Sequence, residues 1–139
     1  MTYNQLLANY KKRHKTLVRP AQGWDSLRNE LWLAYSMGRR RSFTDLGTYN
    51  PASRLPSGAK SDHAYSPSWA FDLGRPGWKG LWGFGLVAAN KYANLLVKHH
   101  LALNIEYVIV GRRIWSRSRG WHPYTGGGHD NHIHVSGHH

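Results

Sequence analysis

A run of histidines at residues 129–136 has the spacing of a metal site. It reads His-Asp-Asn-His-Ile-His-Val-Ser. If this stretch is an extended strand, His132 and His134 lie on one face, about 7 Å apart, because strand side chains alternate. Two imidazoles so placed suit one metal ion, since one can bind it and the other can contact what the ion holds. A histidine-rich tract indicates metal by composition only, so the stretch also fits a surface cluster of histidines.

A second group of polar residues lies far upstream. His63 is followed nine positions later by Asp72, which sits on a short apolar run. Each residue alone is typical of an ordinary loop or turn. Together with the later histidines they offer His, Asp and His from separate segments, and three N/O ligands with an open position are usual for catalytic zinc. The chain has no cysteine, which excludes thiolate ligands.

Composition restricts the class of partner. The 139 residues include 19 Lys and Arg against 7 Asp and Glu, a net charge of +12. Such a charge favours nucleic acid, an anionic membrane surface or an anionic cell-wall polymer. No apolar run approaches the length of a membrane span. We also expect no signal peptide, because the first residues, Met-Thr-Tyr-Asn-Gln, lead into no apolar segment.

Hydrophobic spacing predicts an α+β fold in one domain of residues 1–139. Apolar residues at helical intervals predict helices over 2–16, 24–37 and 85–100, the second ending at Gly38. The β-rich segments 106–110 and 113–116 predict a hairpin. Residues rich in glycine, proline or basic and aromatic side chains predict loops over 47–60, 74–80 and 117–128. Helices followed by a mixed section are typical of α+β proteins.

Three short motifs together resemble a known enzyme family. Ser61-x-His63, Ala70-x-Asp72 and His132-x-His134 are similar to the zinc D-alanyl-D-alanine peptidase group. That group includes VanY-type carboxypeptidases, phage endolysin peptidases, lysostaphin-type enzymes and the Hedgehog signalling domain. The resemblance covers about residues 47–137, a metallopeptidase core, and leaves the helical N-terminal segment, residues 1–46, outside it. It implies a small antiparallel sheet with flanking helices.

The resemblance also implies roles for individual residues. His63, Asp72 and His134 would bind Zn²⁺, and His132 would face the reacting carbonyl or its water. Asp130 is a rival general base. The substrate would be the stem peptide or cross-link of peptidoglycan. For substrate contacts we predict the following residues: Arg54, Ser61, Trp121 and Tyr124.

The chain departs from the family pattern at two points. The gap between His63 and Asp72 is two residues longer than usual and lacks the usual glycine. The family's Glu-x-x-His form is also missing, because Asn131 stands where that acid would precede His134. Asp130, one position away, could serve as a base from a turn.

Three functions follow as hypotheses. The first is a monomeric zinc peptidase of bacterial walls, of the endolysin or wall-remodelling type, made in the host cytoplasm if phage-encoded. A basic surface would concentrate it on anionic wall polymers. The second is a metal-dependent nuclease, since paired histidines and a charge of +12 suit a phosphodiester. The third is a binding module with structural zinc, whose fourth ligand would be His129 or His122.

Overall fold

The structure, a computed structural model, describes residues 1–75, 80–82, 84–129 and 131–139. These residues include three α-helices: α1 (Tyr3–His14), α2 (Trp32–Arg39) and α3 (Phe84–Lys98). Short 3-10 turns lie at Trp24–Ser26, Asn29–Leu31 and Asp62–Ala64. The strands are β1 (Thr44–Gly47), β2 (Ala70–Gly74), β3 (Ile105–Val110), β4 (Arg113–Ser116), β5 (Gly120–Pro123) and β6 (His132–Gly137). The prediction of an α+β fold is confirmed.

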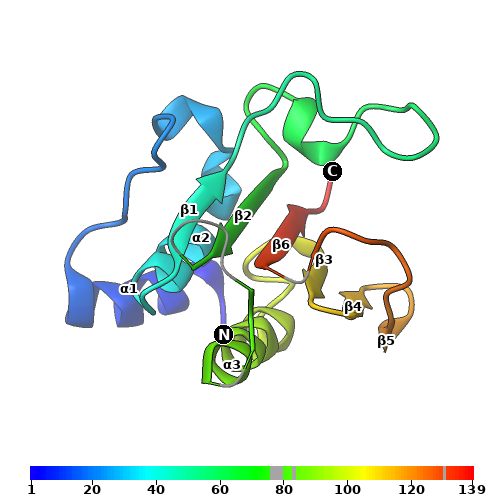
Figure 1. The fold of residues 1–139 in the computed structure, drawn as a ribbon. Coiled ribbons are helices and arrows are strands. Elements are labelled where there is room, and N and C mark those ends of the chain that lie inside the picture. The colour runs from blue at the N-terminus through cyan, green and yellow to red at the C-terminus, as the bar shows by residue number, and fades with distance from the viewer. Residues whose placement is uncertain (76–79, 83, 130) are drawn as a thin grey trace.

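The strands form one antiparallel sheet in the order β1-β2-β6-β3-β4-β5 (Figure 1). The last strand of the chain, β6, therefore lies between β2 and β3. The predicted hairpin is confirmed as β3 and β4, with Val110 opposite Arg113. The prediction of a loop over 117–128 is wrong in its middle section, because β5 extends the sheet there by pairing with β4.

Strand alternation gives this sheet two chemically different faces. On one face, Val135 of β6 lies opposite Phe71 of β2 and Val108 of β3, and all three are fully buried. On the other face, His134 of β6 lies opposite Asp72 of β2. The apolar face packs on helices, so the polar face is left for the candidate site.

Helix α3 is the main support of the apolar face, as predicted. Ala89, Ala93 and Leu96 are fully buried, and α3 packs against β3. The Tyr92 hydroxyl of the same helix donates to the carbonyl of Ala34 in α2 at 2.6 Å. One hydrophobic core includes side chains from both 1–46 and 47–137, so the N-terminal helices are built into the same core as the sheet.

The prediction for residues 24–37 is wrong at both ends. Residues 24–31 form two 3-10 turns, because Leu27 forms a bridge with Ser68 and the Arg28 N–H donates to the Ser68 carbonyl. Gly38 does not end the helix. A Cβ at this position would lie 2.3 Å from a methyl carbon of Leu73, so glycine lets α2 approach β2 closely.

The segment 47–60 is irregular apart from a bridge between Arg54 and Lys60, in agreement with the predicted loop. The loop predicted over 74–80 falls largely on residues 76–79, outside the described residues. Among the residues described, no helix is both long and apolar enough to cross a membrane.

Candidate metal centre

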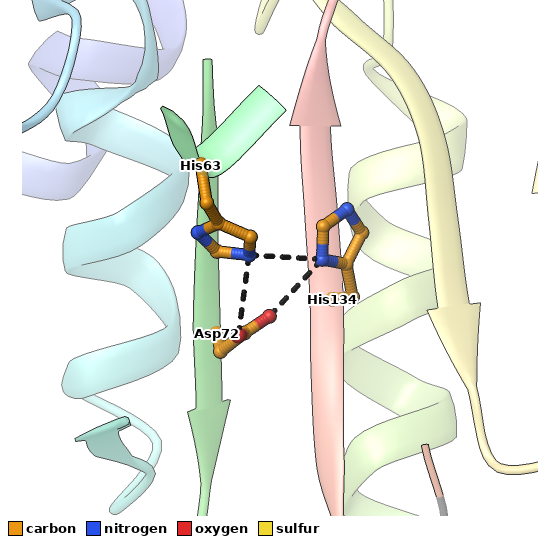
Figure 2. Close-up of side chains that lie close together, drawn as sticks. All are labelled: His63, Asp72 and His134. Carbon is orange, nitrogen blue, oxygen red and sulfur yellow. Dashed lines mark hydrogen bonds and ion pairs between the residues drawn. The ribbon is translucent and has the colours of Figure 1, made fainter. Parts of the chain in front are cut away.

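His63, Asp72 and His134 meet on the polar face of the sheet (Figure 2). His63 sits on the turn Asp62–Ala64, Asp72 is the middle residue of β2, and His134 lies directly opposite it on β6. His63 Nε2 is 3.2 Å from Asp72 Oδ2, and His134 Nδ1 is 3.1 Å from Asp72 Oδ1. The two ring nitrogens are 3.2 Å apart. Three segments distant in sequence thus bring one donor group each to a common centre.

These separations fit a small divalent cation. Ligand atoms about 2.0–2.1 Å from a tetrahedral Zn²⁺ ion lie about 3.3 Å from one another. The two ring nitrogens are 3.2 Å apart, and each lies 3.1–3.2 Å from a different carboxylate oxygen of Asp72. With one donor atom taken from each residue, all three atoms lie within 4.8 Å of one another. Two imidazoles and a carboxylate are also donors that zinc commonly takes. The predicted ligand set therefore forms a group able to hold a metal ion.

Neighbouring groups orient the donors. His63 Nδ1 is 2.7 Å from the Thr48 carbonyl oxygen, which can only accept, so Nδ1 carries a proton and Nε2 faces the centre. Burial lowers the pKa of His63, but the hydrogen bond and charge of Asp72 outweigh it, and the pKa is raised. Burial raises the pKa of Asp72, but His134 and His63 hold it well below its usual range. The carboxyl group is therefore ionised, as a metal ligand must be.

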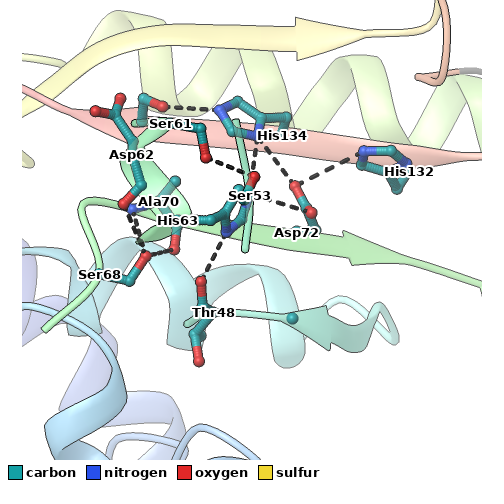
Figure 3. A network of polar contacts seen from close by, with 12 residues as sticks. Thr48, Ser53, Ser61, Asp62, His63, Ser68, Ala70, Asp72, His132 and His134 are labelled. Atoms are coloured by element: carbon teal, nitrogen blue, oxygen red, sulfur yellow. Dashed lines mark hydrogen bonds and ion pairs between the residues drawn. The ribbon is translucent and has the colours of Figure 1, made fainter. Parts of the chain in front are cut away.

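His132 lies beside this group without joining it. Its Nε2 is 3.7 Å from Asp72 Oδ1 (Figure 3). Its Nδ1 is 2.8 Å from the side-chain oxygen of Asn131. Burial, followed by the charges of the other two histidines, lowers its pKa despite the opposing effect of Asp72. His132 and His134 share a face of β6, as predicted. Asp130, the predicted rival base, lies outside the described residues.

A cavity of about 410 Å³ opens over the donor group. Of the predicted substrate contacts, Arg54, Ser61 and Tyr124 line it. Trp121 is not among the described residues that line it. Its ring packs beside the hydrophobic core, and the Arg113 guanidinium lies 4.2 Å from the ring centroid. The structure places Trp121 beside Trp115, its partner across β4 and β5, and its contact with substrate stays a prediction.

His129 and three residues that sequence reasoning missed complete the surroundings. The ring of Tyr107 stacks on His134 with centroids 5.3 Å apart, and Ser136 Oγ is 2.7 Å from His134 Nε2. The third missed group is the Thr48 carbonyl. His129 was considered above only as a fourth zinc ligand. It lines the cavity, and its ring centroid is 4.7 Å from that of His132. Burial and the charges of the two neighbouring histidines lower the pKa of His129 to about 4.

Comparison with known proteins gives one partial similarity. Residues 82–135 match the model of a family described as VldE, C-terminal domain. The match covers less than half of the chain, from the segment before α3 into β6. It includes His132 and His134 but neither His63 nor Asp72. No curated protein and no solved structure matches the chain.

Proposed function

We propose that the protein is a zinc-dependent peptidase that cleaves peptide bonds of bacterial peptidoglycan, of the endolysin or wall-remodelling type. The observation that carries the proposal is the convergence of His63, Asp72 and His134 at 3.1–3.2 Å, with His132 beside them, under an open cavity. The same residues carry the sequence resemblance to the zinc D-alanyl-D-alanine peptidase group.

A metal held by only three protein ligands favours a catalytic site over a structural one. Structural zinc sites are normally closed by four protein ligands, whereas catalytic sites keep a position for water or substrate. Among the described residues, the group able to share one ion comprises His63, Asp72 and His134. His122, one residue considered as a fourth ligand, lies on β5 and bonds the Gly120 carbonyl at 2.9 Å.

Each residue of the site has a definable task. His63, Asp72 and His134 would hold the metal. When bound, Zn²⁺ polarises a carbonyl group and lowers the pKa of water. His132 would donate a hydrogen bond to the carbonyl oxygen of the scissile bond or move a proton at that atom. Its lowered pKa favours the neutral imidazole at neutral pH, which can both accept and donate.

The cavity supports an extended peptide as the substrate. Two loop segments, glycines 126–128 and residues 53–56, line the cavity together with the donor group, and its volume of about 410 Å³ can hold several residues of a peptide. Arg54 is exposed on this lining, and a guanidinium suits the carboxylates that stem peptides carry. Tyr124 offers a ring for packing and a hydroxyl for a hydrogen bond.

The roles of His132 and Asp130 can be separated. We expect His132→Ala to keep its zinc and lose about 10²–10⁴-fold in turnover, the usual contribution of a general acid–base or oxyanion group. Asp130→Asn tests whether Asp130 is the general base instead. A large loss of rate in Asp130→Asn with nearly normal turnover in His132→Ala would reverse the assignment. Loss of metal from His132→Ala would show that the ligand set is wrong.

The function itself is tested on isolated walls. Zinc-loaded protein is incubated with purified peptidoglycan, and the soluble fragments are analysed by mass spectrometry for newly cut peptide bonds. His134→Ala is the inactive control, and supercoiled plasmid is incubated in parallel. We expect peptide fragments and intact plasmid. Nicked plasmid together with untouched peptidoglycan would refute the proposal and favour a metal-dependent nuclease.

A further inference from the structure

The two ring nitrogens of His134 face different partners. Nδ1 points at the common centre, 3.1 Å from Asp72 Oδ1 and 3.2 Å from His63 Nε2. Nε2 points away from it and lies 2.7 Å from Ser136 Oγ. Ser136 stands two positions further along β6, so alternation places both side chains on the polar face.

Only one assignment of the ring proton is compatible with a metal at this centre. A neutral imidazole has one N–H and one lone pair. If Nδ1 gives its lone pair to the ion, the proton must lie on Nε2 and needs an acceptor. Ser136 Oγ is in place to accept it, and this residue is fully buried, so water cannot easily replace the hydroxyl.

A second residue of the sheet contacts the His134 ring. Tyr107 lies opposite Ser136 on β3, and its ring stacks on His134 with centroids 5.3 Å apart. A serine hydroxyl has two acceptor lone pairs, so Ser136 Oγ can accept from His134 Nε2. The arrangement parallels the other side of the centre, where the Thr48 carbonyl accepts from His63 Nδ1. Each histidine donor thus has an acceptor behind it.

We propose that Ser136 is a positioning residue that accepts the Nε2–H of His134 and thereby presents Nδ1 to the metal. The inference rests on the metal site of the proposed function but not on the identity of the substrate. Groups that fix the tautomer of a ligand histidine in this way typically contribute about 10–100-fold to metal affinity.

Zinc binding and ring spectroscopy test the proposal without reference to activity. We expect Ser136→Ala to bind Zn²⁺ about 10–100-fold more weakly than wild type in a chelator competition. Ser136→Thr, which keeps the hydroxyl, should recover most of that affinity. Ser36→Ala is the matched control, because Ser36 is also fully buried and bonds the Val18 N–H, remote from the site. It should bind Zn²⁺ as wild type does.

The wild-type protein provides a second measurement that needs no variant. The ¹⁵N shifts of the His134 ring in the zinc-loaded protein should identify Nδ1 as the bound nitrogen and Nε2 as protonated. Binding through Nε2, or wild-type affinity in Ser136→Ala, would overturn the proposal while leaving the metal site intact. Equal losses in Ser136→Ala and Ser36→Ala would also overturn it. If the wild-type protein binds no Zn²⁺, the metal site of the proposed function is refuted.

Discussion

Zinc should raise the thermal stability of this protein through His63, Asp72 and His134. One donor atom from each residue already lies within 4.8 Å of the other two in the fold, so an ion can bind the native state with little rearrangement. In the unfolded chain the three residues are separated by up to 71 positions and form no such group. A ligand that binds the native state alone shifts the unfolding equilibrium toward it.

The rise in melting temperature follows from the free energy of zinc binding and the unfolding entropy of the chain. Free Zn²⁺ at a thousand times its dissociation constant contributes about 4.1 kcal/mol. A chain of 139 residues has an unfolding entropy of about 0.29 kcal/mol per kelvin, at about 2.1 cal/mol per kelvin per residue. The melting temperature should therefore rise by about 14 °C.

Scanning calorimetry with and without Zn²⁺ measures this rise. His63→Ala, Asp72→Asn and His134→Ala should each lose most of it, whatever their stability without metal. His122→Ala is the control, because it removes an imidazole that lies on β5, and it should retain the full rise. A rise that persists in all three site variants would show that zinc stabilises the fold from another place. No rise in the wild type would refute the metal site.

Three further expectations concern the core, the cavity and the surface. Leu96→Ala should lower the free energy of unfolding by about 2–5 kcal/mol in urea denaturation, because Leu96 is fully buried in the core; an unchanged midpoint would show that α3 does not support the sheet. Tyr124→Ala should raise KM for wall fragments about tenfold through loss of a ring contact, and Trp121→Ala, outside the cavity lining, should raise it less; the reverse order would show that Trp121 is the more important substrate contact. Raising NaCl from about 0.05 to 0.5 M should weaken sedimentation of the protein with purified walls, because salt screens exposed charges; salt-independent binding would rule out a charge-driven association.

Local patterns in the sequence predicted those features of the site that depend on a single element. The alternation of His132 and His134 on β6 is a property of one strand. The periodicity of residues 85–100 likewise identified α3, because its buried residues lie on one face of one helix. The three ligands were named from their types and from the family resemblance.

Contacts between elements could not be read from the sequence. Tyr107 reaches His134 and Ser136 because β3 pairs with β6 in a register that no local pattern specifies. The Thr48 acceptor is a backbone carbonyl, which leaves no signature in residue type. The same reason explains the error at residues 24–31, where pairing of Leu27 with Ser68 overrides helical spacing.

The longer gap between His63 and Asp72 does not separate the two side chains. The chain leaves the turn at Asp62 and returns to it, because the Trp69 N–H donates to the Asp62 carbonyl at 3.0 Å and the Ser68 hydroxyl lies 3.3 Å from the same oxygen. Residues 63–68 therefore form a closed loop. His63 Nε2 and Asp72 Oδ2 accordingly remain 3.2 Å apart. The longer spacing than in the peptidase group that the sequence resembles therefore leaves the donor group together.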